Sequence, residues 1–202
     1  IERGTVIANP LTGTLPEPYK GIRKKKFVTA VRLDPQKNLE MLIDAFSRFE
    51  KLYPDYTLEI YGEGSQRSYL ENKCKEMNVE NKVVLKGFSK NLHENILDAS
   101  AFIMSSNYEG MSNSLLEALA LGVPVISTDH PIGGARMFIK NGNNGILTKV
   151  GDTDEMFNAL LFAANNPEKM QAMADEAIRI RQQISVEKIV SQWMSYIEKV
   201  CG

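Results

Sequence analysis

The chain has 202 residues, of which 43% are hydrophobic and 24% are charged, with 24 basic residues against 25 acidic ones. These proportions are ordinary for a globular protein, and the length suffices for one domain with its own apolar core. A net charge of -1 excludes a protein-wide surface for nucleic acid, so no nucleic-acid partner is expected.

Residues 1–20 are expected to form a linker or a first strand. The chain begins at Ile1, without a methionine and in strand-like residues, which indicates a fragment or a processed chain. The basic run from Arg23 to Lys26 is interpreted as a solvated approach to a buried strand, in preference to a site for an anionic surface.

No stretch approaches the ~18 apolar residues of a membrane-spanning helix. The two cysteines, Cys74 and Cys201, offer neither a metal-ligand spacing nor a disulfide framework.

Short strand-like runs alternate with helical patterns through the middle of the chain. The predicted strands are residues 26–32, 56–62, 82–88, 101–106, 123–128 and, as a further candidate, 145–150. Between the first two strands, Asn38 is the expected N-cap of a helix over residues 39–52. A second helix is expected over residues 65–77. Because strands that alternate with helices pair in parallel, the pattern predicts an α/β fold with a doubly wound parallel sheet.

The chain from about Asp152 onward is almost purely helical in pattern. Three consecutive helices are predicted there, over residues 153–166, 167–183 and 186–200. We therefore expect a single domain over residues 1–202, with a helical tail over residues 152–202. In such sheets ligands bind beyond the carboxyl ends of the strands, which is where the polar and glycine residues of this chain gather.

Two acids, Glu109 and Glu117, stand eight positions apart around the start of a predicted helix. Gly110 and the polar run from Ser112 to Ser114 mark the loop that enters it. The first amide groups of a helix carry partial positive charge, so Glu109 and Glu117 would flank an anion bound there. The alternative is a capping box, in which Ser114 and Glu117 only bond backbone N–H groups.

Arg32 and Lys37 form a second constellation, at the end of the first predicted strand. Pro35 lies between them, so both cations can turn towards the edge of the sheet. A planar guanidinium and a point charge together suit the several oxygens of a diphosphate. The alternative is two solvated surface cations.

Glycine turns follow several predicted strands, in YGEG (61–64), KGF (86–88) and PIGGAR (131–136). Each permits a close backbone approach to a ligand, but any strand-to-helix turn needs such residues. The chain contains neither GxGxxG nor GxxxxGK[ST], so no dinucleotide fingerprint or P-loop is predicted. His93 and His130 are interpreted as loop histidines rather than ligands.

Six segments, in order, resemble the carboxyl-terminal, donor-binding half of retaining glycosyltransferases with the two-domain GT-B fold, the group 1 (family 4) class. The stretch YEGMSNSLLEALALGVPVIST resembles the family's E-x7-E signature and the strand that follows it. The other five are NP (9–10), VRLDPQKN (31–38), YGEGSQRSYLE (61–71), VVLKGF (83–88) and NGNNGILTKVGD (141–152). The resemblance implies a Rossmann-like GT-B carboxyl-terminal domain and a nucleotide-diphosphate sugar as donor, with UDP as the expected nucleotide.

The resemblance also implies a role for each matching residue. Arg32 and Lys37 would grip the diphosphate and stabilise the leaving group. Glu109 would bind hydroxyls of the transferred sugar, and Glu117 would accept hydrogen bonds from the ribose. The remaining donor contacts would be Gly87 and Phe88 at the base, and Gly110, Met111, Ser112 and Asn113 at the sugar and phosphate. No metal and no cofactor are implied, because the cations and the helix terminus take the metal's place.

The sequence departs from the family pattern in the turn after the fifth strand. Relatives commonly carry proline and an acid there, whereas this chain reads Gly134-Ala135-Arg136-Met137. Met137 in place of the usual acid puts the function of that acid in doubt. The surrounding DHPIGGAR is similar to enzymes that build surface polysaccharides.

The resemblance implies a whole enzyme that transfers a hexose or N-acetylhexosamine to a glycan or lipid-linked acceptor. The acceptor would be bound by an amino-terminal domain that is absent from this chain, so the isolated chain is expected to be inactive. The expected location is the cytoplasm, with peripheral association of the whole enzyme at the inner face of the membrane. Two alternatives stay open: a non-catalytic nucleotide-binding interaction module and a GT-B epimerase-like enzyme.

Overall fold

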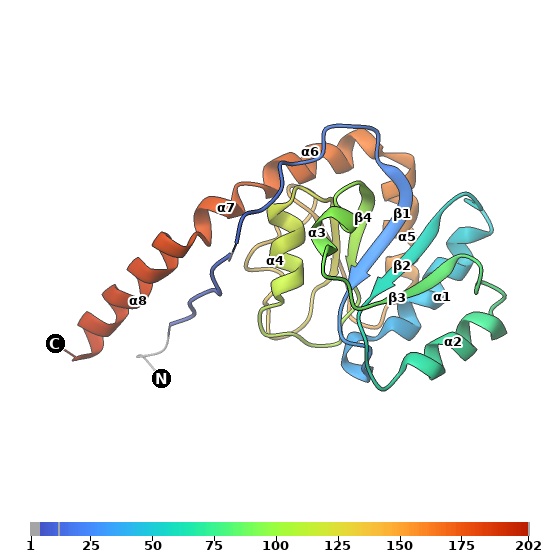
Figure 1. The fold of residues 1–202 in the computed structure, drawn as a ribbon, viewed down its shortest axis with the longest axis horizontal. Coiled ribbons are helices and arrows are strands. Elements are labelled where there is room, and N and C mark those ends of the chain that lie inside the picture. Colours follow the sequence, from blue (N-terminus) through green and yellow to red (C-terminus); the bar gives the residue numbers. More distant parts are fainter. Residues whose placement is uncertain (1–4, 12, 202) are drawn as a thin grey trace.

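The computed structural model describes residues 5–11 and 13–201, in which six parallel strands form one sheet (Figure 1). The strands are β1 (Lys24–Ala30), β2 (Thr57–Tyr61), β3 (Val83–Gly87), β4 (Ala99–Met104), β5 (Val125–Thr128) and β6 (Ile146–Thr148). Their order across the sheet is β3-β2-β1-β4-β5-β6. The chain therefore adds strands to one side of β1 and then crosses to the other side, so the order reverses between β1 and β4. This is the doubly wound arrangement that the sequence predicts.

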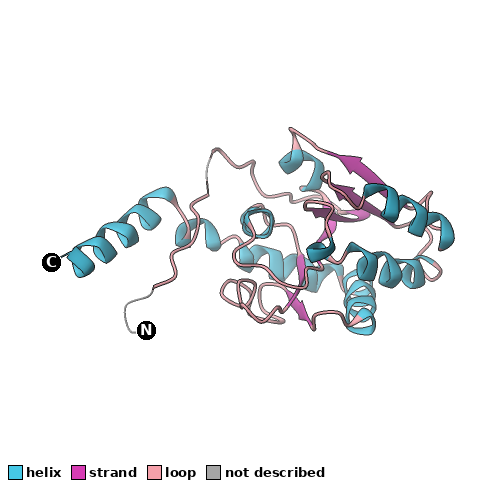
Figure 2. Ribbon diagram, turned by 90° about the horizontal axis from the view of Figure 1, so that it is seen from below, coloured by secondary structure: helices cyan, strands magenta, loops and turns pink. Residues whose placement is uncertain are grey.

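Helices cover both faces of the sheet, and Figure 2 shows the strands between them. The helices are α1 (Leu39–Glu50), α2 (Arg67–Glu76), α3 (Leu92–Ile96), α4 (Asn113–Ala120), α5 (Thr153–Asn165), α6 (Pro167–Ala177), α7 (Ile180–Gln183) and α8 (Val186–Cys201). One apolar cluster joins the sheet to α1, α2 and α5, and another joins it to α4 and α7. Residues of α6 belong to both clusters. The two clusters make one core on each face, because successive strand side chains point to opposite faces.

Several predicted boundaries shift in the structure. The first strand begins two residues earlier than predicted and ends at Ala30, so Arg32 lies in the following loop rather than at the strand end. Asn38 caps α1 as predicted, and its side chain accepts a hydrogen bond from the N–H of Met41. The predicted helix over residues 167–183 is two helices, α6 and α7, with a tight turn at Ile178 and Arg179. That turn packs the Ile178 side chain close to Gly122.

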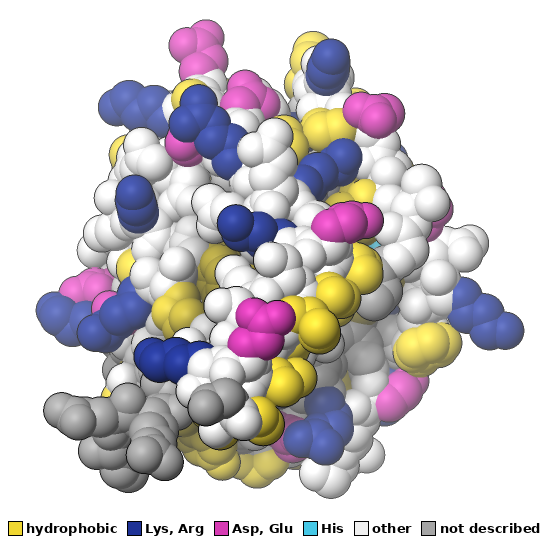
Figure 3. All heavy atoms as spheres, turned by 90° about the vertical axis from the view of Figure 1, so that its left-hand side faces the viewer, with side chains coloured by type: hydrophobic (Ala, Val, Ile, Leu, Met, Phe, Trp, Pro, Cys, Tyr) yellow, Lys and Arg dark blue, Asp and Glu magenta, His cyan; other side chains and the backbone are white. Residues whose placement is uncertain are grey.

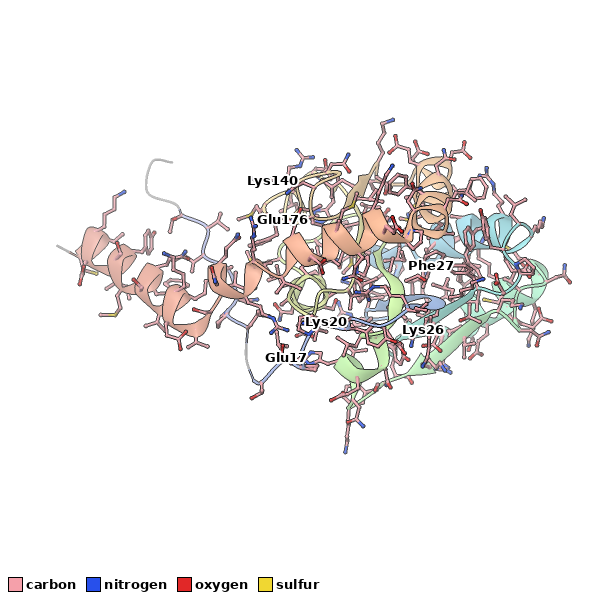
Figure 4. All side chains as sticks on the ribbon, turned by 90° about the horizontal axis from the view of Figure 1, so that it is seen from above. Glu17, Lys20, Lys26, Phe27, Lys140 and Glu176 are labelled. Carbon is pink, nitrogen blue, oxygen red and sulfur yellow. The ribbon has the colours of Figure 1, made fainter. Side chains whose placement is uncertain are left out.

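The described residues before β1 form neither helix nor strand, so the strand-like interpretation of this segment is wrong for residues 5–11 and 13–20. Residues 1–4 lie outside the described part of the chain. The segment instead runs along α6 and α7 (Figures 1 and 4). The N–H of Leu11 donates to Ile184, and the guanidinium of Arg181 donates to the carbonyl of Pro16 at 2.8 Å. These bonds satisfy the Leu11 N–H and the Pro16 carbonyl without a neighbouring strand.

The last helix, α8, projects from the body of the domain, whereas α5 and α6 pack on the sheet (Figure 1). The face that α8 turns to solvent carries apolar side chains, seen within the hydrophobic band of Figure 3. They are Val186, Val190, Trp193, Met194, Ile197 and Val200. Within residues 5–11 and 13–201, none of the helices has the length and apolar character that crossing a bilayer requires.

The basic run at the start of β1 is not simply solvated. Arg23 donates to the carbonyl groups of Leu97, Ala99 and Gly122 and to the side chain of Gln171. Burial lowers the pKa of Arg23 to about 10. The side chain of Lys26 is 13% exposed and pairs with Asp98, whereas the next residue of the strand, Phe27, is fully buried in the apolar core (both labelled in Figure 4). The interpretation of this run as solvated is therefore wrong for Arg23 and Lys26, which tie the strand to its neighbours.

Replacing Arg23 by alanine should destabilise the domain. The Arg23→Ala change leaves three partly buried carbonyl groups without their donor, which costs about 1–3 kcal/mol of unfolding free energy. Urea unfolding followed by circular dichroism measures this loss. The matched control is Lys20→Ala, which removes an exposed cation of the same segment and should change stability by less than about 0.5 kcal/mol. Equal stability of the two variants would contradict the structural role of Arg23.

Candidate functional site

The loops that follow β1 and β4 meet where the strand order reverses. The first loop contains a short 3-10 helix, η1 (Pro35–Lys37), and the second spans residues 105–112. The Gln36 side chain donates to the Tyr108 carbonyl at 2.7 Å, and the Gln36 carbonyl accepts from the Asn107 N–H at 2.8 Å. The Asn38 and Asn107 side chains bond to one another, and the Ser105 hydroxyl donates to the Lys37 carbonyl at 2.8 Å. These four bonds fix the two loops against each other.

Lys37 and Glu109 form an ion pair between the two loops. Their side chains are only 13% and 10% exposed, so solvent screens the pair weakly. The buried hydroxyl of Ser106 donates to the same carboxylate at 2.8 Å. The carboxylate is therefore held in one orientation by a cation and a hydroxyl, and the ammonium group is brought to the carboxyl edge of the sheet.

A cleft of about 340 Å³ opens beside this ion pair. Six of the predicted site residues line it, namely Arg32, Lys37, Glu109, Met111, Ser112 and Asn113. The Arg32 side chain pairs with Asp34 at 2.6 Å. Because it is 72% exposed, it has room to turn towards a ligand in the cleft. The cleft thus brings Arg32 and Lys37 together with Glu109, whereas Glu117 is not among its lining residues.

The N-terminus of α4 forms one wall of the cleft. Ser112 is the N-cap, and its hydroxyl accepts from the Leu115 N–H. The alternative of a capping box between Ser114 and Glu117 is wrong, because Ser114 is already the second residue of the helix. The first amide groups of α4 and its dipole give this wall partial positive charge.

Glu117 lies in the second turn of α4, on a different side from Glu109. Its carboxylate bonds Nε2 of His93 at 3.1 Å, and both side chains are about one-third exposed. His93 lies in helix α3, so its interpretation as a loop histidine is wrong. A second cavity, of about 40 Å³, lies against Glu117 and is also lined by Asn9, whose amide donates to Asn113 at 2.9 Å. Asn113, in the first turn of α4, lines both cavities, so Glu109 and Glu117 contact separate cavities near the helix start.

Gly87 ends β3 and Phe88 follows it, further along the same edge. Gly87 has φ +73°, a conformation that glycine adopts without strain, and its carbonyl accepts from the Gly62 N–H. Phe88 is 75% exposed. Neither residue lines the cleft beside Lys37 in this structure.

The loop between β5 and β6 closes against Gly110. A methyl group added at Gly134 would lie 1.6 Å from the Gly110 carbonyl oxygen, so only glycine permits this approach. Met137, in the same loop, is half exposed, and Arg136 pairs with Asp129 at 2.7 Å. His130 lies in this loop, as the sequence indicates, but its side chain is only 1% exposed.

Among the residues that the structure describes, no cluster of three His, Cys, Asp or Glu side chains could hold a metal ion. Both cysteines, Cys74 and Cys201, are free. Four polar residues at or near this edge are given no site role by the sequence, namely Asn9, Ser106, Asn107 and His130. Only the serines that follow β4 could have been recognised from the sequence, because polar residues at a strand end indicate the ligand-binding edge of such a sheet.

The sequence profile of the family described as "Glycosyl transferases group 1" matches residues 18–180. The chain belongs to this glycosyltransferase family. The doubly wound sheet and the match together confirm the expected carboxyl-terminal GT-B fold.

Known glycosyltransferases resemble this domain in sequence and fold. A Campylobacter jejuni protein, N-acetylgalactosamine-N,N'-diacetylbacillosaminyl-diphospho-undecaprenol 4-alpha-N-acetylgalactosaminyltransferase, is 34% identical over 86% of this chain and 47% of its own. TarM of S. aureus, solved with UDP, superimposes with a TM-score of 0.87 and 25% identity over 95% of this chain and 39% of its own. Pneumococcal GtfA, solved with UDP and GlcNAc, has a TM-score of 0.77 and 26% identity, over 96% of this chain and 38% of its own. The chain spans about half the length of the curated relatives it matches.

Two glycines of this glycosyltransferase domain form a matched pair for testing the contact between the loops. Gly134→Ala should lower the unfolding free energy by about 1–3 kcal/mol, because the added methyl group collides with the Gly110 carbonyl. Gly110→Ala meets no atom within 4 Å and should change it by less than about 0.5 kcal/mol. Thermal and urea unfolding measure both values, and a Gly134→Ala variant as stable as the parent would refute the close approach.

Proposed function

We propose that this chain is the donor-binding half of a retaining glycosyltransferase and that it binds a UDP-sugar in the cleft beside Lys37 and Glu109. The observation that carries the proposal is the meeting of a cation, a carboxylate and a helix N-terminus at one point of the sheet. This combination suits a sugar diphosphate, because amides and cations bind phosphate and a carboxylate accepts from hydroxyl groups. The presence of UDP in the TarM and GtfA structures supports the choice of nucleotide.

In the proposed complex, Lys37 and Arg32 bind the diphosphate and stabilise the charge that develops on the departing UDP. Glu109, oriented by Ser106, accepts hydrogen bonds from the transferred sugar. Backbone amides from Gly110 to Asn113 bind the phosphate near the sugar. The two acids therefore bind different parts of one donor instead of acting as a glycosidase acid/base pair.

The proposed nucleoside contacts lie to the other side of the helix start. Glu117 accepts hydrogen bonds from the ribose hydroxyls, and its bond to His93 fixes its position. Gly87 and Phe88 contact the base, and the exposed ring of Phe88 is available for that contact. We propose no metal and no cofactor for this reaction.

We propose that the whole enzyme transfers a hexose or N-acetylhexosamine to a glycan or lipid-linked acceptor in surface polysaccharide synthesis. The diphospho-undecaprenol in the name of the Campylobacter relative supports a lipid-linked acceptor. Such an acceptor is consistent with an enzyme in the cytoplasm that associates peripherally with the inner face of the membrane.

An amino-terminal domain, outside this chain, would bind the acceptor in the proposed enzyme. The length of the curated relatives supports such a domain, since the chain spans about half of it. The exposed apolar face of α8 is available to pack against it. The 202 residues alone should therefore bind the donor and transfer sugar poorly or not at all, in contrast to the whole enzyme.

A non-catalytic nucleotide-binding module is the alternative from a different class, and an epimerase-like GT-B enzyme is the alternative within enzymes. The presence of Arg32, Lys37 and Glu109 around one cleft, with Glu117 on the helix that forms its wall, favours the transferase over both. The non-catalytic module can be distinguished from the transferase, because its nucleotide affinity would not depend on Glu117.

Removal of Glu117 tests the proposed ribose contact. Glu117→Ala should weaken UDP binding by about 1.5–3 kcal/mol, the scale of hydrogen bonds to a charged group. Isothermal calorimetry with UDP measures the change. The matched control is Glu94→Ala, which removes the same charge from an exposed position of the neighbouring helix α3 and should leave affinity unchanged. Unchanged UDP affinity in a folded Glu117→Ala variant would favour the interaction module.

A further inference from the structure

His130 is buried, whereas the side chain of the other histidine, His93, is 28% exposed. His130 follows β5 at the carboxyl edge of the sheet, its side chain is almost fully enclosed, and its Nδ1 has no hydrogen-bond partner. A buried polar atom without a partner costs free energy, so such an atom calls for a functional explanation.

The loop that holds His130 is fixed on the wall of the proposed donor site. The Gly133 N–H donates to the His130 carbonyl at 2.9 Å and closes a tight turn. A methyl group added at Gly134 would lie 3.4 Å from Cε1 of the His130 ring and 1.6 Å from the Gly110 carbonyl oxygen. The ring therefore lies beside the segment that carries Glu109 and Gly110.

Four charged groups act on the His130 ring, and in the free domain they form two pairs. Glu109 and Asp129 favour a proton on the ring, whereas Arg136 and Lys37 oppose it. Lys37 is paired with Glu109, and Arg136 is paired with Asp129. Burial is the largest effect and lowers the pKa of His130, so the imidazole is neutral near pH 7 in the free domain.

A bound donor would change the charges that act on the His130 ring. The proposed diphosphate draws the ammonium group of Lys37 away from Glu109, which is only 10% exposed. A buried carboxylate that loses its cation pays a large desolvation cost, and the diphosphate adds further negative charge nearby. The Arg32 guanidinium is mostly exposed and faces the diphosphate in the same cleft, so it does not compensate Glu109. Among the groups named here, His130 is the one that can acquire positive charge.

We propose that His130 is a reserve cation of the donor site, neutral in the free domain and protonated when the diphosphate of a nucleotide sugar takes Lys37 from Glu109. This inference rests on the proposed function. The step is a single proton transfer from solvent to the imidazole, with no bond broken in the donor. His130 acts through Glu109 and is a positioning residue rather than a catalytic one.

Proton uptake by His130 determines how the affinity for the nucleotide sugar depends on pH. If ligand binding raises the pKa of His130, the complex holds more protons than the free domain between the two pKa values. Affinity for the nucleotide sugar is then highest below the lower value and falls as pH rises through this window. Because one proton is linked to binding, the affinity can change by at most about tenfold per pH unit.

Calorimetry of the 202-residue chain tests this linkage. The titrant is the tighter-binding of UDP-glucose and UDP-N-acetylglucosamine, because a diphosphate esterified at both ends exchanges no proton near neutral pH. Titrations at about pH 6.5, in buffers of different ionisation enthalpy, should give net uptake of a fraction of a proton. Uptake should vanish in a folded His130→Asn variant.

A second measurement needs no substitution at His130. The NMR titration midpoint of the His130 Cε1–H, assigned by its loss in His130→Asn, should move upward when the nucleotide sugar binds to the unsubstituted chain. An unchanged midpoint, or uptake that persists in a folded His130→Asn variant, overturns the proposal while the proposed function stands. If neither nucleotide sugar binds at millimolar concentration, both the reserve cation and the proposed donor site are overturned.

Discussion

Lys37 and Glu109 form an ion pair, almost removed from solvent, at the point where the strand order of the sheet reverses. Such a pair persists only if its geometry is fixed, because the loss of either partner leaves a buried charge. The hydrogen bonds of Gln36, Asn38 and Ser105 supply that fixation by binding the loop after β1 to the loop after β4. The cleft and its charges therefore follow from one contact between loops that lie 72 residues apart along the chain.

The two acids of the E-x7-E segment share the start of α4 but serve different cavities. Glu109 faces the cleft with Lys37, whereas Glu117 faces His93 and the smaller cavity beside Asn9. A helix terminus between two carboxylates suits a ligand with an anionic centre and hydroxyl groups at both ends. A nucleotide sugar has this distribution of groups, which connects the geometry to the family of the chain.

The sequence predicts the doubly wound sheet because strand and helix periodicities alternate cleanly. It also predicts that Arg32, Lys37 and Glu109 lie at one edge of the sheet, because the loops that follow parallel strands meet there. It does not predict the partners of these residues. The burial of Arg23 depends on carbonyl groups of Leu97, Ala99 and Gly122, which only folding brings near. The position of His130 likewise depends on the approach of Gly134 to Gly110, a contact between distant loops that local pattern does not encode.

The central claim is that the carboxyl edge at β1 and β4 binds a nucleoside diphosphate. The most direct test is a calorimetric titration of this chain with UDP, GDP and ADP, repeated with a Lys37→Met variant that removes the charge at the centre of the cleft. The proposed site predicts that UDP binds at millimolar concentration or below, more tightly than GDP and ADP, and that Lys37→Met abolishes binding. Failure of all three nucleotides to bind the unsubstituted chain, or UDP affinity unchanged in Lys37→Met, would contradict it.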